Sequence, residues 1–141
     1  GRHGRNFLKT ILTRALADPA RPLRVVDDQW GSPTWSRRLA EQTRVLIEHG
    51  ARGTFHATAE GHGTWFDLAT AFLHAMGVPH RVDPCPTRDY PTPATRPANS
   101  ILENRRLKEL GIHVMVDWRE DLARFAAEHR PALLRECAPG A

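Results

Sequence analysis

Five prolines fall within the sixteen residues from Pro84 to Asn99, PCPTRDYPTPATRPAN. Each proline removes a backbone hydrogen-bond donor, so we expect this stretch to be a loop without regular structure. A long ordered loop inside a compact domain usually carries a function, and otherwise such a segment is disordered. Regular structure is therefore expected on either side of the loop. Tyr90 and Arg96 are the side chains within it that we consider as site residues.

Hydrophobic periodicity predicts short strands and amphipathic helices in alternation on both sides of this loop. We expect helices at Arg5–Ala17, Thr34–Gly50, Thr64–Gly77, Asn104–Leu110 and Trp118–His129, and strands at Leu23–Val26, Gly53–Ala59 and His80–Asp83. Thr34 and Thr64 are the expected N-caps of their helices. The residues expected to face the core are Phe7, Leu8, Ile11, Leu12, Leu16, Leu39, Thr43, Leu46, Ile47, Trp65, Leu68, Ala69, Phe72, Leu73, Leu107, Leu110, Trp118, Leu122 and Phe125.

This alternation indicates an α/β fold. The strands are too few and too short for a self-contained doubly wound sheet. We therefore expect residues 1–141 to form a single portion of a larger protein, with an incomplete parallel sheet and a helical cap. The chain begins with Gly1 rather than Met, which also favours a fragment.

The charge and the reactive residues argue against several functions. The net charge is +4, but the arginines are scattered among acidic residues and form no basic run, so we expect no nucleic-acid partner. No apolar stretch is long enough to cross a membrane. Cys85 and Cys137 indicate no disulfide framework, which favours a reduced, cytoplasmic protein. The eight histidines show no metal-ligand spacing, so we expect no metal site.

No complete catalytic motif is visible. The chain contains no GxxGxxG, no GxSxG and no phosphate-binding loop, and Tyr90 is followed four residues later by Ala94 rather than Lys. Asp27 and Asp28 are adjacent on a strand and point to opposite faces, which makes them a poor acid/base pair. We therefore expect neither catalytic nor cofactor-binding residues, and binding is favoured over catalysis.

The stretch Val25–Thr34, VVDDQWGSPT, runs from a strand through a turn into a helix, where ligands of α/β proteins usually bind. Its alternative role is a turn in which the two carboxylates satisfy local backbone donors. The guanidinium of Arg96 matches phosphate oxygens, although a structural salt bridge would also explain it. Tyr90 could be an anchor for the loop. Amides that could read a sugar or a base are Asn6 and Gln29, and apolar surface for a ring could come from Phe7, Trp30 and Trp35.

Several segments together resemble the carboxyl half of the dTDP-4-dehydrorhamnose reductase family, which are extended short-chain dehydrogenase/reductases. The matching segments are GRNFLKTIL at Gly4–Leu12, VVDDQWGSPTW at Val25–Trp35, GTFHATAEGHGTWFDLA at Gly53–Ala69, YPTPATRPANSILENRRLKELGI at Tyr90–Ile112 and DWREDL at Asp117–Leu122. They cover nearly the whole chain in the order in which the family has them.

This resemblance implies the carboxyl-terminal part of a Rossmann-type fold. The full-length enzyme would reduce the 4-keto group of a dTDP-linked sugar with NADPH or NADH, giving dTDP-L-rhamnose for cell-surface polysaccharide. The dinucleotide-binding domain and the catalytic Tyr-x-x-x-Lys would lie upstream. The portion 1–141 is then expected to bind substrate and to be inactive alone, and a homodimer is an expectation for the full-length form only.

The resemblance also implies residue roles. It places Asn6 near the diphosphate and directs Arg96, followed by Pro97, at the nucleotide phosphates. Asp27–Thr34, which includes Gln29, Trp30 and Thr34, would border the sugar pocket. Two other functions are kept: a non-catalytic module resembling the regulatory subunit of methionine adenosyltransferase, and a different nucleotide-sugar reductase or epimerase of the extended class.

Overall fold

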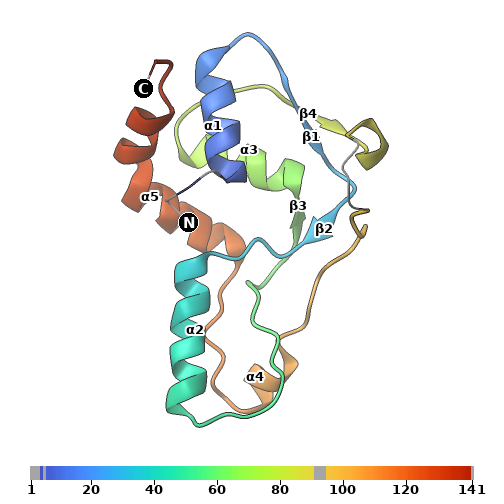
Figure 1. The fold of residues 1–141 in the computed structure, drawn as a ribbon, viewed down its shortest axis with the longest axis vertical. Coiled ribbons are helices and arrows are strands. Elements are labelled where there is room, and N and C mark those ends of the chain that lie inside the picture. The colour runs from blue at the N-terminus through green and yellow to red at the C-terminus, as the bar shows by residue number, and fades with distance from the viewer. Residues whose placement is uncertain (1–3, 5, 91–94, 141) are drawn as a thin grey trace.

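A computed structural model describes Gly4, residues 6–90 and residues 95–140. In Figure 1 the upper part holds most of the regular structure, and α2 and α4 form a smaller lower lobe. The helices are α1 (Phe7–Ala17), α2 (Ser36–Glu48), α3 (Trp65–Ala75), α4 (Arg105–Glu109) and α5 (Trp118–Cys137), with a 3-10 turn η1 (Thr87–Asp89). The strands are β1 (Leu23–Val26), β2 (Trp30–Gly31), β3 (Gly63–Thr64) and β4 (Val82–Cys85).

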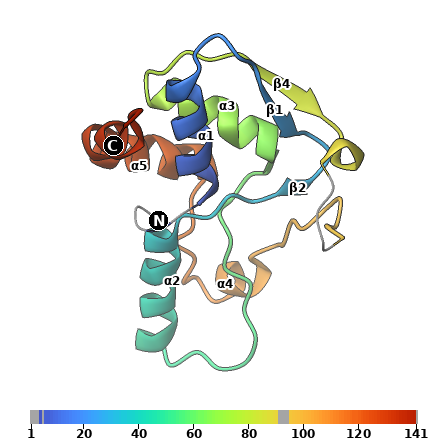
Figure 2. The same cartoon turned by 45° about the horizontal axis from the view of Figure 1, so that its top comes forward.

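The main core lies in the upper part, between α1, α3 and α5 and against β1. Its largest buried side chains include Leu12 of α1, Phe72 and Met76 of α3, and Trp118 at the start of α5. In Figure 2, turned by 45°, α1 and α3 lie between α5 and the two longer strands, whereas α2 extends away from them. The expected core positions on α1 and α3 are therefore largely confirmed. One exception is Trp65, which is 40% exposed.

Strands β1 and β4 form a two-stranded parallel sheet, with Leu23 opposite Val82 and Val26 opposite Cys85. The prediction that regular structure stops before Pro84 was wrong, because β4 runs through this proline. Within the described ranges β4 pairs with β1 alone, and a proline is tolerated where a strand has a free edge. The α/β class and the incomplete parallel sheet are both confirmed.

The second sheet is a short antiparallel pair, in which Trp30 and Gly31 of β2 lie opposite Thr64 and Gly63 of β3. Thr64 caps α3 as expected. Its hydroxyl accepts from the amide of Asp67, and the Asp67 carboxylate accepts from the amide of Thr64. β3 therefore leads directly into α3, and this junction fixes the start of the helix beside β2.

The prediction that Thr34 caps the next helix was wrong. The N-cap of α2 is Trp35, and it makes no side-chain capping bond. The Thr34 hydroxyl instead donates to the Ser32 carbonyl and accepts from the amide of Ala59, at 2.9 and 3.0 Å. Thr34 thus joins two chain segments rather than starting a helix.

Helix α2 turns a different face inward from the one that its apolar residues predict. Leu39 and Ile47 are 40% and 73% exposed, and Thr43 is exposed too. The fully buried residue is Gln42, whose amide donates to the Ile112 carbonyl and accepts from the amide of Val114, both at 2.8 Å. The helix is held by this polar contact, and its apolar side faces solvent.

Gly53–Ala59 is extended but is not a strand, which corrects that prediction. A strand needs a neighbouring strand, and among the described residues none pairs with residues 53–59. The next residue, Glu60, forms a single bridge with Asp117. Asn104 takes the place of a neighbour at one residue, because its side-chain amide accepts from Thr58 N and donates to Thr58 O, at 3.0 and 2.8 Å.

The two closing helices lie where they were expected, with different ends. Leu110 was assigned to the core but is 44% exposed. Helix α5 continues past Pro131 to Cys137, and Leu133 and Cys137 are buried. Burial of these side chains outweighs the backbone hydrogen bond that the proline removes. At the other end of the chain, α1 begins at Phe7 with Asn6 as its N-cap, and Arg5 lies outside the described residues.

Candidate functional site

Two adjoining cavities, each of about 300 Å³, lie beside β2 and the start of α3. Gln29, Trp65 and Arg96 line both of them. The first cavity is otherwise bordered by Trp30, Gly31, Ser32, Pro33, Gly63, Thr64, Leu68, Pro97 and Ser100. The second is bordered by Phe7, Thr10, Ile11, Arg14, Arg24, Val25, Val26 and Tyr90. The stretch from Gln29 to Pro33 and the proline-rich loop therefore face a common space, as the sequence predicts.

Arg96 is held at this space by the backbone of the loop that follows it. The amide of Trp30 donates to the Ala98 carbonyl at 2.8 Å, and the amide of Ser100 donates to the Trp30 carbonyl at 2.9 Å. These bonds attach the loop to β2 just after Arg96. Among the described residues Arg96 makes no ion pair, so the structural salt bridge considered as its alternative role is not formed there.

Gln29 and Trp65 form the wall that the two cavities share. The indole Nε1 of Trp65 donates to Gln29 Oε1 at 3.2 Å, and Gln29 Nε2 donates to Thr87 Oγ1 at 2.9 Å. The Phe7 ring meets the Trp65 ring edge-on, with centroids 4.8 Å apart and planes at 61°. The amide of Gln29 therefore orients the indole, and the half-exposed ring presents apolar surface to both cavities.

Asp28 has a local structural role. Its carboxylate accepts from the backbone amide and the hydroxyl of Thr87. The Thr87 hydroxyl and the Thr87 amide, in that order, lower the pKa of Asp28 below its ordinary value. At this residue the alternative of a turn that satisfies local donors is confirmed. Asp28 fixes η1 beside Gln29 and is not positioned as a catalytic acid.

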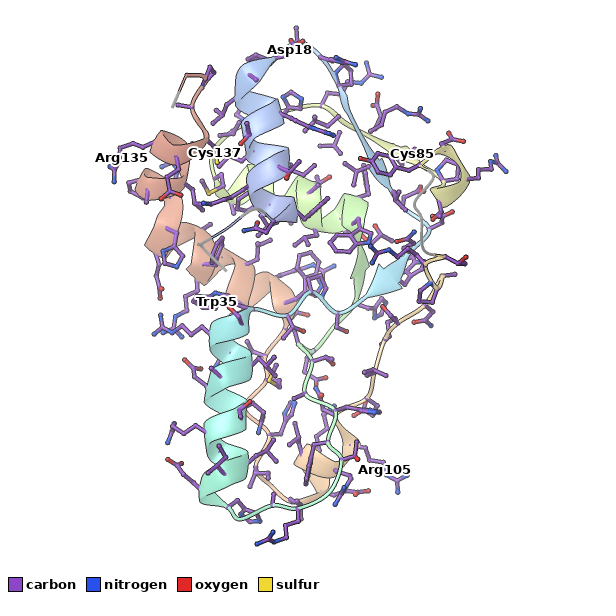
Figure 3. All side chains as sticks on the ribbon, in the orientation of Figure 1. Asp18, Trp35, Cys85, Arg105, Arg135 and Cys137 are labelled. Carbon is purple, nitrogen blue, oxygen red and sulfur yellow. The ribbon has the colours of Figure 1, made fainter. Side chains whose placement is uncertain are left out.

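Three of the expected ligand residues are used elsewhere in the fold. Asn6 Oδ1 accepts from Lys9 N at 3.1 Å and so caps α1, and neither Asn6 nor Thr34 lines the two cavities. The centroids of the Trp35 and Phe125 rings are 5.9 Å apart. Figure 3 labels Trp35, which lies where α2 meets α5. The assignment of Trp35 to a ligand surface was therefore wrong. Phe7, Gln29, Trp30 and Arg96 do come together.

Three further residues line these cavities without a signal in the sequence that marks them as site residues. Trp65 was assigned to the core by its helical spacing, and Arg14 had no motif around it. Arg24 lines the second cavity as well, with one nitrogen 2.7 Å from Asp89. The three arginines at this cavity make its rim cationic, which suits an anionic ligand. Tyr90 lies at the same cavity and is 50% exposed, so the partly buried anchor considered for it stays a prediction.

The glycine turn before α3 does not fit the diphosphate of a dinucleotide cofactor. The turn Gly61-His62-Gly63 leads to a helix, as such a site requires, but the N-terminus of α3 already binds the Asp67 carboxylate. Gly61, at φ +72°, also lies so close to Asp117 that an added Cβ would sit 2.4 Å from its carboxylate. A phosphate would meet two acidic groups there.

The described residues form neither a metal-binding cluster nor a membrane-spanning helix. They contain no cluster of three or more His, Cys, Asp or Glu side chains with metal-binding geometry. None of their helices has the length and apolar character required to cross a bilayer. Cys85 and Cys137 are both buried free thiols, and Figure 3 shows them far apart, near β4 and at the end of α5. Burial raises the pKa of the Cys85 thiol, which makes it unreactive.

This fold is shared with solved reductases of nucleotide sugars. A dTDP-4-dehydrorhamnose reductase from Clostridium acetobutylicum superposes with a TM-score of 0.84 and 34% identity, over 89% of this chain and 44% of that one. A dTDP-4-dehydrorhamnose reductase from Bacillus anthracis, solved in complex with NADP, superposes with a TM-score of 0.80 and 32% identity, again over 89% of this chain and 44% of that one. The class is therefore that of a Rossmann-like extended short-chain dehydrogenase/reductase.

Residues 1–130 match the model of the RmlD substrate binding domain, and the chain belongs to this family. The dTDP-4-keto-6-deoxy-D-glucose reductase of Streptomyces niveus is 39% identical over 119 residues, which are 84% of this chain and 41% of that protein. The chain thus spans less than half the length of the relatives it matches. The family resemblance drawn from the sequence motifs is confirmed.

Proposed function

We propose that this chain supplies the sugar-nucleotide site of a dTDP-4-dehydrorhamnose reductase, the enzyme that reduces a dTDP-linked 4-keto sugar to dTDP-L-rhamnose. Family membership and the names of the relatives support this class of substrate. The observation that carries the proposal is that Arg96 lies where two cavities of similar size meet. A nucleotide sugar has the same layout, with a base and ribose on one side of a diphosphate and a sugar on the other.

The proposed arrangement follows from what lines each cavity. The diphosphate binds Arg96, since a guanidinium donates two parallel hydrogen bonds to phosphate oxygens. The thymine ring lies in the second cavity, against Phe7 and Trp65, with Arg14 and Arg24 at its rim. The sugar lies in the first cavity, against Gln29 and Trp30. In this arrangement Asn6 and Thr34 do not contact the ligand. Asn6 caps α1, and Thr34 supports the turn at Ser32.

NADPH or NADH would be bound mainly by the part of the reductase outside this chain, because this chain has no glycine fingerprint and the turn before α3 does not fit a diphosphate. When bound, the nicotinamide supplies the hydride for the 4-keto group. The chain contains no Tyr-x-x-x-Lys pair, so we propose that it holds the sugar nucleotide and has no reductase activity alone. We also propose a cytoplasmic location, in keeping with two buried free thiols.

Isothermal titration of dTDP tests the site. The protein for this measurement is one polypeptide in which this chain replaces the matching portion of the Clostridium acetobutylicum reductase. We expect Arg96→Ala to weaken dTDP binding by about 1.5–3 kcal/mol, the range for a hydrogen bond to a charged group.

Arg88→Ala is the matched control, because it removes the same charge from the nearby turn η1, where the Arg88 side chain is 87% exposed. We expect this variant to bind dTDP as the parent does. Equal affinities for the parent and Arg96→Ala would refute the assignment of Arg96. An absence of dTDP binding together with tight binding of another protein would instead favour the regulatory module.

A further inference from the structure

Four side chains joined by hydrogen bonds lead from the turn η1 to the wall that the two cavities share. Trp65 Nε1 donates to Gln29 Oε1 at 3.2 Å, and Gln29 Nε2 donates to Thr87 Oγ1 at 2.9 Å. The Thr87 hydroxyl in turn donates to the carboxylate of Asp28. These four residues, here called the relay, come from three separate segments. Asp28 and Gln29 follow β1, whereas η1 and α3 begin with the other two.

The two ends of the relay fix the direction of every bond in it. An indole N–H can only donate, and an ionised carboxylate can only accept. Asp28 is held ionised, because the hydroxyl and the amide of Thr87 lower its pKa. The single hydroxyl proton of Thr87 is then committed to Asp28, so its oxygen has to accept from Gln29. The Gln29 amide nitrogen therefore faces Thr87, and its oxygen faces the indole.

The orientation of the Gln29 amide matters at the cavities. Gln29 and Trp65 line both of them, whereas Asp28 and Thr87 line neither. A half-turn of the amide would place its NH2 group against the indole N–H, and the bond would be lost. The indole is 40% exposed and meets the Phe7 ring edge-on. Since Gln29 Oε1 is its acceptor among the described residues, loss of this bond leaves the ring without a polar restraint.

We propose that Thr87 and Asp28 are positioning residues of the sugar-nucleotide site. The Asp28 carboxylate commits the Thr87 proton, Thr87 orients the amide of Gln29, and this amide holds the Trp65 indole between the two cavities. The other role open to Asp28 and Thr87 is support of η1 alone, through the bonds of 2.9 and 3.0 Å from the Thr87 amide to the carboxylate. The orientation of the indole follows from the relay bonds, and only its effect on dTDP binding rests on the proposed function.

The indole N–H signal of Trp65 in nuclear magnetic resonance tests the relay without a ligand. The protein is the polypeptide in which this chain replaces the matching portion of the Clostridium acetobutylicum reductase, isotopically labelled at its tryptophans. The signal that disappears in Trp65→Phe is that of Trp65. We expect Thr87→Val to move this signal upfield and to speed its exchange with water at least about 3-fold, as expected for loss of one hydrogen bond between neutral groups. The Trp118 indole, which donates to the His62 carbonyl at 3.2 Å, is the internal reference.

Thr87→Ser is the matched variant, because it keeps the hydroxyl that Thr87→Val removes. We expect Thr87→Ser to keep the signal and the exchange rate of the parent. Asp28→Ala leaves the hydroxyl but frees its proton to point toward Gln29, so its exchange rate should fall between those of Thr87→Val and the parent. Thr13→Val, the same substitution at an exposed position of α1, should leave the Trp65 signal unchanged.

Titration of dTDP tests whether the relay matters to the ligand. Thr87→Val should weaken binding by about 3–10-fold when Trp65 is present. With Trp65→Phe in the same protein the further loss should be less than about 2-fold, because the relay then has no indole N–H to hold. Loss of support for η1 alone would weaken binding by the same factor in both backgrounds.

Four results would overturn the proposal. One is a Trp65 signal that Thr87→Val leaves unchanged, and another is a Thr87→Ser variant that behaves as Thr87→Val does. The third is an equal loss of dTDP affinity with and without Trp65→Phe. The fourth is a parent-like Asp28→Ala, which would remove the carboxylate from the relay. The expected Trp65 signals in a protein that binds no dTDP would instead refute the proposed function and leave the orientation of the indole intact.

Discussion

The ion pair between Arg38 of α2 and Asp121 of α5 ties the lower lobe to the main core, and its removal gives the sharpest stability prediction. The guanidinium Nη2 lies 3.0 Å from Asp121 Oδ1, and Nε lies 3.2 and 3.3 Å from the two carboxylate oxygens. Only 13% of the Arg38 side chain and 2% of the Asp121 side chain are exposed. This contact raises the pKa of Arg38.

Asp121→Ala leaves a nearly buried guanidinium without its main partner. Breaking a buried pair from one side costs about 3–5 kcal/mol. Glu41 stays 3.1 Å from Arg38 and part of the side chain reaches water, so we expect the lower end of that range, about 3 kcal/mol. With a urea slope of about 2 kcal/mol per molar, the unfolding midpoint should fall by about 1.5 M.

Glu128→Ala is the matched control, because Glu128 also lies on α5 and pairs with the preceding arginine of α2. Arg37 Nη1 is 2.9 Å from Glu128 Oε2, but those side chains are 47% and 33% exposed, so the expected loss is about 0.2–1 kcal/mol. Replacing both members of the buried pair, as Arg38→Met with Asp121→Leu, should recover most of the stability. Equal urea midpoints for Asp121→Ala and Glu128→Ala would refute this reasoning.

Two further predictions concern buried or paired polar groups. Gln42→Ala should lower the free energy of unfolding by about 2–4 kcal/mol in urea titrations, because it leaves one buried donor and one buried acceptor without partners. Gln42→Glu should be no more stable than Gln42→Ala at pH 7, because it buries a carboxylate against the Ile112 carbonyl. A parent-like Gln42→Ala would contradict the role of the amide. Asp28→Asn should melt below the parent at pH 7. Since contacts with Thr87 lower the pKa of Asp28, the carboxylate stabilises the fold fully above its ordinary pKa of 3.8. That contribution is lost as pH falls through the lowered value, so the gap in melting temperature should close in acid, and a gap independent of pH would contradict it.

Local features of the sequence account for the parts of the fold that were predicted correctly. Thr64 and Asp67 sit three residues apart, as a capping box requires. The apolar run at Leu23–Val26 predicted the strand β1 correctly, but not its burial on both faces, because only Leu23 and Val25 are buried. Helical periodicity likewise located α1 and most of the α3 face. Periodicity gives the angle of an apolar residue on its helix but not what lies opposite. Trp65 therefore was assigned to the core although it borders the cavities.

The errors on α2 and on residues 53–59 have a common physical cause. An apolar stripe predicts that a helix meets an apolar surface, and alternating residues predict that a segment meets a strand. Neither pattern says whether the partner belongs to the same stretch of chain. Similarly, nothing near Gln42 in the sequence announces that its partners are about seventy residues away. The residues of the proposed ligand site could be grouped from the sequence because the family motifs indicate which distant segments lie close together in the fold.

Gln42 and Asn104 also bear on how relatives of this chain can vary. Each is buried and offers one donor and one acceptor to the backbone of a segment that has no strand beside it. A side-chain amide carries both groups on one planar unit. We therefore expect few substitutions at these two positions among relatives, although neither residue lines a ligand cavity. An alignment would rank them beside Arg96, and a survey of invariant polar residues would mistake two structural supports for parts of an active site.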